Sequence, residues 1–402
     1  MTNPDSRPTT DSVAADVLRC QRDDFSLEGD VHYLNCAYMG PLPRRSAAAG
    51  IAGLRAKEHP WEISSDDFFD DSDQVRRLFG EIAGAPAERI AIMPSVSYGV
   101  ATAAKNLRIG QGEEIVVVGE QFPGNVYSWR RLAAETGGRV VTVDRPVNPE
   151  NPSKVGAEWN RRILEAIGPR TRIVSMAPLH WTDGTRFDLE AIGARARAVD
   201  AAFIIDATQA VGGVPMDVQT IGADLLVAGA YKWLLGPYSV ALAFVGTRFD
   251  DGVPLEEGWI TRKGSQDFKG LVNYTDEYAP EAIRYDVGER SNFALMPVTK
   301  SSLQHLLEWE VSRVEDYIVR LSDPLIRTAR ETGFHLEEDA WRSRHLFGLG
   351  MPQGIDIVSL KERLEAAKIY ISLRGNSLRI SPNVYNTEED VAALCEVLRE
   401  VT

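Results

Sequence analysis

The sequence predicts an α/β protein in which a mainly parallel sheet, covered by helices, is followed by a smaller α+β part. Between about residues 76 and 246, short apolar runs alternate with amphipathic stretches of ten or more residues, which is typical of βαβ units. From about residue 300 the pattern changes to long helical periodicity. Because 402 residues exceed one ordinary core, we expect two domains.

The predicted strands are continuous apolar runs, so both faces of the sheet should be covered. They are Glu113–Val118, Arg139–Val143, Arg172–Met176, Ala201–Ile205 and Asp224–Val227. The helical patterns between them are Asn125–Glu135, Glu158–Ile167 and Leu189–Val199.

The C-terminal part has three helix signals. The pattern over Lys300–Val319 predicts one long helix, and Asp323-Pro324 reads as a cap followed by proline at the first position of another. Thr387–Val401 opens with Thr387-x-x-Asp390, a capping box before an apolar-faced helix. We predict a tail at residues 1–30, a large domain at 31–284 and a small domain at 285–402.

Charge and cysteine content exclude several classes of protein. The net charge of −14, from 44 Lys+Arg and 58 Asp+Glu, disfavours a nucleic-acid or anionic-membrane surface. The three cysteines are too few and too scattered for a disulfide framework or a metal site, which favours a reducing cytoplasm. The N-terminus lacks the features of a secretory signal, and no apolar stretch is long enough for a membrane helix.

Two predicted strands end on residues that can carry chemistry. Asp206 follows one apolar run directly, and Lys232 lies just beyond the next. Because ligands of an open α/β sheet bind beyond the carboxyl ends of its strands, both side chains should face one crevice. Pyridoxal 5′-phosphate (PLP) chemistry requires such a pair, a lysine for the Schiff base and proton transfer, and a carboxylate for the pyridine nitrogen. Taken alone, an aspartate and a lysine are more often a salt bridge or surface groups.

The residues around this pair carry a more specific signal. The chain reads DATQAVGGVPMDV at 206–218, GAD at 222–224 and YKWLLGP at 231–237. This pattern resembles the class V aminotransferase family of fold-type I PLP enzymes, from Tyr33-Leu34-Asn35 to the C-terminus. The resemblance implies a large domain with a seven-stranded-type sheet, a smaller C-terminal domain, PLP as cofactor, an amino-acid substrate and a homodimer with shared active sites.

The resemblance also implies roles for residues beside the pyridine ring. Lys232 matches the lysine that carries PLP and acts on the substrate, Asp206 the partner of the pyridine nitrogen, and Gln209 the hydrogen-bond donor to the phenolic oxygen. Tyr231 takes the place of a histidine that many members have near the phosphate. Phe122, in a Phe-Pro-x-Asn segment, matches the ring stacked on the pyridine.

A phosphate site is predicted at a strand-to-helix turn. Ser95, Val96 and Ser97 follow a short apolar strand at Ile90–Met93 and open a helical stretch. The start of a helix offers free N–H donors and the positive end of its dipole, which suit a phosphate dianion. The alternative is a serine that only caps the helix. The family resemblance makes this the less favoured interpretation.

The remaining site residues rest on the resemblance alone. His180 lies in a turn that lines the cofactor, with a packed histidine as an equally weighted alternative. Ser291 or Asn292 would reach the phosphate of the neighbouring subunit. Arg374 matches the clamp on the substrate carboxylate, and Arg379 is near enough to share that role.

One departure from the family narrows the chemistry. Cysteine desulfurases carry a nucleophilic cysteine on the loop after the carboxylate-binding arginine, and residues 375–379 contain none. We therefore expect transamination or β-elimination, with amino-acid epimerisation or kynureninase-like hydrolysis as alternatives. No metal-binding spacing is found among the histidines, and a non-catalytic PLP-fold protein is disfavoured by the intact Lys232, Asp206 and Gln209.

Overall fold

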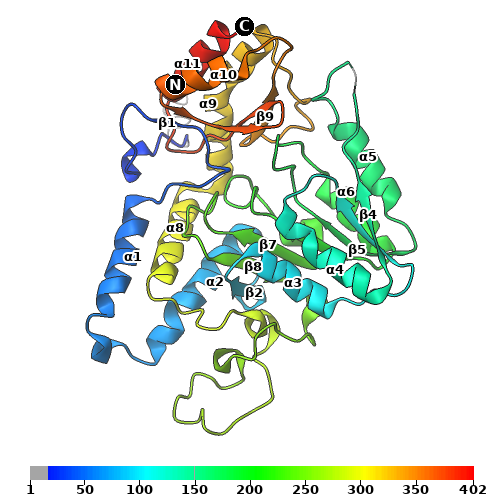
Figure 1. Ribbon diagram of the computed structural model, residues 1–402. Coiled ribbons are helices and arrows are strands. Elements are labelled where there is room, and N and C mark those ends of the chain that lie inside the picture. Colours follow the sequence, from blue (N-terminus) through cyan, green and yellow to red (C-terminus); the bar gives the residue numbers. More distant parts are fainter. Residues whose placement is uncertain (1–16, 149) are drawn as a thin grey trace, which may run out of the picture.

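The computed structural model describes residues 17–148 and 150–402, and its centre is a seven-stranded sheet (Figure 1). The strands run in the order β2-β8-β7-β6-β5-β3-β4, and β8 alone is antiparallel to its neighbours. They are β2 (Ile90–Met93), β3 (Glu114–Val118), β4 (Arg139–Val143), β5 (Thr171–Met176), β6 (Ala202–Asp206), β7 (Leu225–Gly229) and β8 (Ala241–Val245). The predicted mainly parallel α/β fold is confirmed, whereas strand β8 was not predicted.

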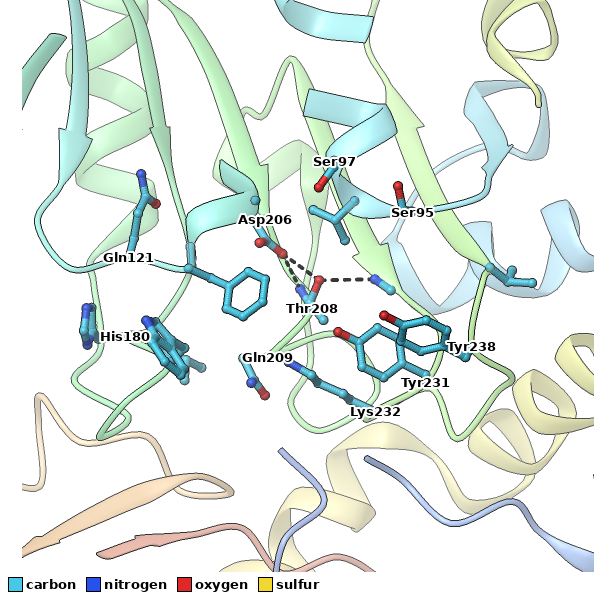
Figure 2. Close-up of a pocket in the computed structure, with 18 of the residues that line it drawn as sticks. Ser95, Ser97, Gln121, His180, Asp206, Thr208, Gln209, Tyr231, Lys232 and Tyr238 are labelled. Atoms are coloured by element: carbon cyan, nitrogen blue, oxygen red, sulfur yellow. Dashed lines mark hydrogen bonds between the residues drawn. The ribbon is translucent and has the colours of Figure 1, made fainter. Parts of the chain in front are cut away.

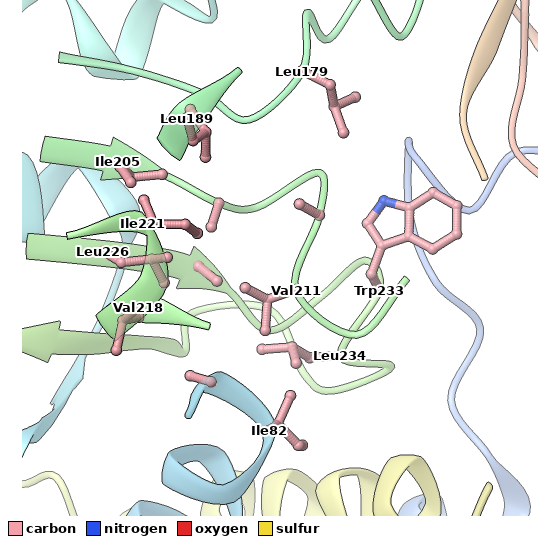
Figure 3. Close-up of a cluster of buried hydrophobic side chains, with 14 of the residues drawn as sticks. Ile82, Leu179, Leu189, Ile205, Val211, Val218, Ile221, Leu226, Trp233 and Leu234 are labelled. Atoms are coloured by element: carbon pink, nitrogen blue, oxygen red, sulfur yellow. The ribbon is translucent and has the colours of Figure 1, made fainter. Parts of the chain in front are cut away.

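Helices cover both faces of this sheet, as the continuous apolar strands predict. Phe203 and Ile205 of β6 belong to one apolar core, part of which Figure 3 shows, while Ala202 and Ile204 belong to a second core on the other face. Alternate side chains of a strand point to opposite faces, so two cores require apolar residues at every position. The helices in this part are α3 (Val96–Asn106), α4 (Tyr127–Thr136), α5 (Gly156–Ala166), α6 (Leu189–Ala198) and the short α7 (Val218–Ile221).

A second, smaller sheet lies in the C-terminal part. Its antiparallel strands run in the order β11-β12-β9, with β11 at Ser372–Arg374, β12 at Ser377–Ile380 and β9 at Phe347–Gly350. Helices α9 (Val311–Glu331), α10 (Ile357–Ala366) and α11 (Glu388–Glu400) pack with it around a third apolar core. The predicted capping box of α11 is confirmed, because Thr387 and Asp390 bond each other's backbone N–H. The division at residue 285 stays a prediction.

Two predictions for the preceding helices were wrong. The stretch predicted as one helix at Lys300–Val319 is divided between α8 (Leu295–Trp309) and α9 (Val311–Glu331), separated by Glu310 with φ +60°. Asp323-Pro324 does not start a helix, because Pro324 lies inside α9. The apolar stripe of α9 continues past the proline to Leu325 and Ala329 in the third core, and this burial offsets the lost backbone hydrogen bond.

The N-terminal segment joins the two sheets. Phe25 is buried against Trp309 and Tyr385, and α1 (Arg44–Ala56) packs on α8 together with α2 (Asp70–Ala83). Strand β1 (His32–Tyr33) pairs in parallel with β10 (Ile369–Tyr370). The first sixteen residues of the predicted tail lie outside the described part of the chain. None of the helices in that described part is both long and apolar enough to span a membrane.

Candidate active site

Asp206 and Lys232 line one cavity of about 290 Å³ at the carboxyl ends of β6 and β7 (Figure 2). Strand β6 ends at Asp206, and β7 ends at Gly229, three residues before Lys232. Adjacent parallel strands place their carboxyl ends at the same sheet edge. The predicted convergence of this pair therefore follows from the sheet topology.

The carboxylate of Asp206 is held on one side only. Thr208 donates to Oδ1 twice, from its backbone N at 3.1 Å and its hydroxyl at 2.6 Å, and the Gly229 N–H in turn donates to that hydroxyl. No hydrogen bond reaches Oδ2 from any described residue. Burial raises the pKa of Asp206, although the bonds from Thr208 and the charge of Lys232 act in the opposite direction. A cationic ligand at Oδ2 would favour the ionised form.

Lys232 is a buried amine among aromatic rings. It is 7% exposed, and its Nζ lies 5.6 Å from the ring centroid of Phe122 and 5.4 Å from that of Tyr231. Burial lowers the pKa of Lys232 to about 8, with Asp206 opposing this shift and the charge of Arg379 adding to it. A lysine with this pKa has an appreciable neutral fraction near neutral pH, which a nucleophile or proton acceptor needs.

The turn after Lys232 is held in an unusual conformation. Leu235 has φ +52°, a region that residues with a branched side chain seldom adopt. Its carbonyl accepts from the Ser302 hydroxyl of α8 at 2.7 Å. On the other side, Gly40 packs against the Lys232 carbonyl so closely that a Cβ would lie 2.2 Å from its oxygen. Both contacts fix the backbone from which the lysine extends.

Gln209 lies at the cavity wall with its side chain already partly engaged. Its Nε2 donates to the Ala37 carbonyl at 3.0 Å, and its Oε1 accepts from Trp233 Nε1 at 3.0 Å. His345 Nε2 bonds the Gln209 carbonyl oxygen at 2.6 Å. A primary amide has two donor hydrogens, so one remains for a ligand.

The strand–turn–helix arrangement on which the predicted phosphate site depends is observed between β2 and α3. Ser95 caps α3, its hydroxyl accepting from the Tyr98 N–H at 3.2 Å, and Ser95, Val96 and Ser97 all line the cavity. The first N–H groups of a helix have no partner within it, so those of Val96 and Ser97 are free for an anion.

Two rings and a histidine form another wall of the cavity. Phe122 packs edge-on against Trp181, with centroids 5.6 Å apart, and Trp181 is held by a bond from its Nε1 to the Glu120 carbonyl. His180 is 2% exposed, with Nδ1 at 2.7 Å from the Thr182 hydroxyl. The Nε2 of His180 is buried without a partner among the described residues. Burial lowers the pKa of His180, so the ring is neutral.

Arg379 and Arg374 lie close to this wall. Arg379 is 1% exposed and donates to the Trp181 carbonyl at 3.0 Å and to the Ser372 hydroxyl at 3.2 Å. The guanidinium of Arg374 lies 5.4 Å from the Trp181 ring centroid. The charges of both arginines lower the pKa of Lys232, although neither arginine is among the residues that line the cavity.

Ser291 and Asn292 do not line the cavity of their own chain. The Ser291 hydroxyl donates to the Phe68 carbonyl, and Asn292 Oδ1 accepts from the N–H groups of Ala294 and Leu295 at the start of α8. Their predicted contact with a neighbouring subunit stays a prediction.

Two residues near the lysine were not predicted. Thr208 orients Asp206, a role that its place two residues after the aspartate could have suggested. Cys36 is buried with Sγ 3.7 Å from the Lys232 carbonyl oxygen, and Asn383 donates to that sulfur at 3.2 Å. Burial raises the pKa of Cys36 to about 12, so it is a neutral thiol.

Comparison with known proteins identifies the family. The class V aminotransferase model matches residues 64–337, which is more than half of the chain. The chain belongs to the class V aminotransferase family. It is 25% identical to an uncharacterized aminotransferase, YcbU, of Bacillus subtilis over 79% of this chain and 80% of that protein. It is 24% identical to the isopenicillin N epimerase of Streptomyces clavuligerus over 94% and 96% of the two chains.

Solved structures show the same fold. A C-DES mutant with glycine covalently linked to its PLP cofactor superposes with a TM-score of 0.81, covering 95% of this chain and all of that one at 19% identity. The resemblance and the fold expected from the sequence are both confirmed. The protein is a PLP-dependent enzyme of this family.

The cavity fits this cofactor. It combines a buried lysine of lowered pKa, a buried carboxylate with one oxygen free, and a helix N-terminus for the phosphate. These groups suit the aldehyde, the pyridine nitrogen and the phosphate of PLP, in that order.

Proposed function

We propose that this enzyme binds PLP on Lys232 and acts at the α-carbon of an amino acid, by transamination or β-elimination. The observation that carries this proposal is the buried lysine of pKa about 8 that shares a cavity with the buried Asp206. When bound, PLP supplies an electron-withdrawing ring that weakens the bonds at the substrate's α-carbon.

The groups around the cavity suit the parts of the cofactor. The Asp206 oxygen without a partner would pair with the pyridine nitrogen, and the free amide hydrogen of Gln209 would bond the phenolic oxygen. Ser95, Val96 and Ser97 would bind the phosphate.

Three further residues would complete the cofactor site. Phe122 would cover the ring face, and Tyr231 would donate to the phosphate from the opposite wall. His180, neutral and with Nε2 without a partner among the described residues, would bond the cofactor or substrate.

Lys232 is our candidate for the proton transfer. Its neutral amine would remove a proton from the α-carbon of the substrate. A general base works best when its pKa lies near the operating pH, and a value of about 8 satisfies this condition, whereas that of an ordinary lysine does not.

Arg379 is our candidate for binding the substrate α-carboxylate. Its guanidinium is buried beside the cavity wall, its Nε has no partner, and within residues 17–148 and 150–402 it forms no salt bridge. A buried cation without an anion is costly, and a carboxylate can satisfy it with two parallel hydrogen bonds. Arg374 is the residue that the sequence resemblance assigns to this role, and it lies beside the same tryptophan.

Epimerisation is the alternative with a specific observation behind it. The isopenicillin N epimerase relative spans nearly the whole chain, so the two proteins share more than the cofactor-binding core. Epimerisation begins with loss of the same α-proton and ends with its return from the other side. Kynureninase-like hydrolysis is the other alternative, since a kynureninase of Deinococcus radiodurans is 26% identical over 78% of this chain and 76% of that protein.

We also propose a cytoplasmic homodimer. Large apolar side chains are exposed on and beside α1, among them Leu54 at 64% and Trp61 at 75%. Such a surface is typical of a subunit interface. In that dimer Ser291 or Asn292 would approach the partner's phosphate site, which would explain why neither lines the cavity of its own chain. Light scattering on the purified protein tests the dimer.

The main proposal is tested by visible absorption and proton exchange. The purified protein should be yellow, and Lys232→Ala should lose the band of the lysine-linked cofactor. In deuterium oxide the wild type should exchange the α-proton of its substrate, and Lys232→Ala should do so about 10²–10⁴ times more slowly. Release of an oxo acid with amination of a second oxo acid indicates transamination, pyruvate with ammonia indicates elimination, and an inverted centre indicates epimerisation. A protein that takes up no PLP would contradict the proposal.

A further inference from the structure

The hairpin of β11 and β12 presents two arginines on one face. Arg379 lies directly opposite Ser372 in the strand register, and Arg374 lies two residues beyond Ser372 on the same strand. Residues two apart on a strand share a face, so both arginines point to the same side. As diagonal neighbours of an antiparallel pair they have Cα atoms about 7–8 Å apart.

Arg374 has no acidic partner in the described chain. Its Nη1 donates to the carbonyl of its own neighbour, Leu373, at 3.0 Å, and its Nε is buried without a partner among the described residues. The Trp181 ring lies 5.4 Å away, a separation typical of an arginine stacked on an aromatic side chain. A stacked guanidinium keeps the edges of its fork available for a planar anion.

The two arginines of the hairpin have no counter-ion among the described residues. Their hydrogen bonds go to the Leu373 and Trp181 carbonyls and to the Ser372 hydroxyl, which are all neutral groups. The arginines also repel each other, because the charge of Arg374 adds to the lowering of the Arg379 pKa. One α-carboxylate would neutralise one arginine and leave the other without an anion.

We propose that Arg374 binds a second carboxylate, carried by the side chain of the substrate, so that the enzyme acts on a dicarboxylic amino acid. Arg379, the more deeply buried of the two, holds the α-carboxylate, and Arg374 selects for the charged side chain. This inference rests on the proposed function. It deepens that proposal by naming a substrate class.

The test compares acidic amino acids with their amides, which have nearly the same shape. Isothermal calorimetry on the PLP-loaded enzyme should show that L-glutamate or L-aspartate binds at least about tenfold more tightly than L-glutamine or L-asparagine. In Arg374→Gln this preference should fall to about twofold or less, while the affinity for the amides stays within about twofold of wild type. Arg374→Lys, which keeps a point charge without the fork, should retain part of the preference.

Arg131→Gln is the matched control, because Arg131 is an exposed arginine of α4 with its side chain 77% accessible. It should leave both affinities unchanged. An equal loss of affinity for acids and amides in Arg374→Gln would overturn the inference and assign Arg374 to the α-carboxylate. A wild type that binds acids and amides equally would overturn it without any variant, so the test does not depend on the folding of Arg374→Gln.

Failure of this inference is distinguishable from failure of the proposed function. A protein without the absorption band of the lysine-linked cofactor contradicts the function itself. A protein that keeps the band and binds amino acids, but prefers no side-chain charge, contradicts only the second carboxylate.

Discussion

The cofactor side of the cavity and the hairpin of β11 and β12 differ in how their polar groups are paired. On the cofactor side, Thr208 fixes Asp206, and Ala37 and Trp233 fix the amide of Gln209. On the hairpin side, Arg374 and Arg379 have buried Nε atoms without partners and no salt bridge to any residue of the described chain. Preorganised groups suit a cofactor that stays bound, and unpaired cations suit an anion that arrives with each turnover.

The largest expected effect comes from the charge of Asp206. Asp206→Asn keeps an oxygen that can accept both bonds from Thr208 but removes the negative charge that would hold a proton on the pyridine nitrogen. We expect kcat to fall by about 10²–10³, with little change in the melting temperature. Steady-state kinetics and thermal unfolding check this. A wild-type kcat would show that the carboxylate serves only to order the turn.

On the hairpin, a substitution should change substrate affinity and stability. Arg379→Met removes the proposed partner of the α-carboxylate, so we expect substrate affinity to fall about 10–100-fold. The same change removes a buried charge without a counter-ion, so the free energy of unfolding should rise by about 1 kcal/mol. Calorimetry and urea denaturation measure the two quantities. A less stable protein with unchanged affinity would mean that Arg379 is a structural residue.

His345 tests how much the hydrogen bonds on the cofactor side of the cavity contribute to stability. It bonds the Gln209 carbonyl oxygen and packs edge-on against Trp233, with ring centroids 4.3 Å apart. His345→Phe keeps a ring but leaves that buried carbonyl without its donor, so we expect a loss of about 1–3 kcal/mol of unfolding free energy at pH 7.

The pH dependence of that loss has a definite sign. Burial lowers the pKa of His345 from 6.5 to about 4, so the unfolded chain binds a proton more readily than the native one between these values. This histidine's contribution is therefore complete above pH 6.5 and declines as the pH falls towards 4, by up to about 3 kcal/mol. Urea denaturation of both proteins between pH 7 and pH 4.5 should show the difference between wild type and His345→Phe shrinking. A difference independent of pH would contradict the buried neutral ring.

The smallest effect concerns the titration of Lys232. Only the neutral amine attacks an aldehyde, so uptake of PLP by the cofactor-free protein should accelerate with rising pH, with a midpoint near 8. Because the charge of Arg374 lowers this pKa, Arg374→Gln should move the midpoint upward by a few tenths of a pH unit. Stopped-flow absorbance measures both midpoints. A midpoint near 10 in the wild type would mean that water reaches the amine freely.

The cofactor side of the cavity was more predictable from the sequence than the hairpin of β11 and β12. Continuous apolar runs place the strands within about two residues of their observed bounds, and strand ends of a parallel sheet converge whatever the loops do. The choice of partners for the Gln209 amide depends on Ala37, which is distant in the chain, and periodicity carries no such information.

The helix predictions failed where tertiary packing overrides local preference. Glu310 adopts φ +60° between α8 and α9, and Pro324 is retained inside a helix by the apolar core beneath it. Strand β8 was missed, although its five residues are all buried. The shared face of Arg374 and Arg379 follows from hairpin register, which depends on pairing with β9 as well as on the turn.

The segment at residues 35–40 has a consequence for how the protein tolerates insertions. Cys36 N–H donates to the Ser381 carbonyl, two residues beyond Arg379, and Gly40 N–H donates to the Tyr231 carbonyl, one residue before Lys232. A few peptide units thus set the spacing between Arg379 and Lys232. Tyr38 and Met39 are exposed, and by accessibility alone they would be a permissive site for added residues. Lengthening the chain there would instead alter the separation of these two side chains.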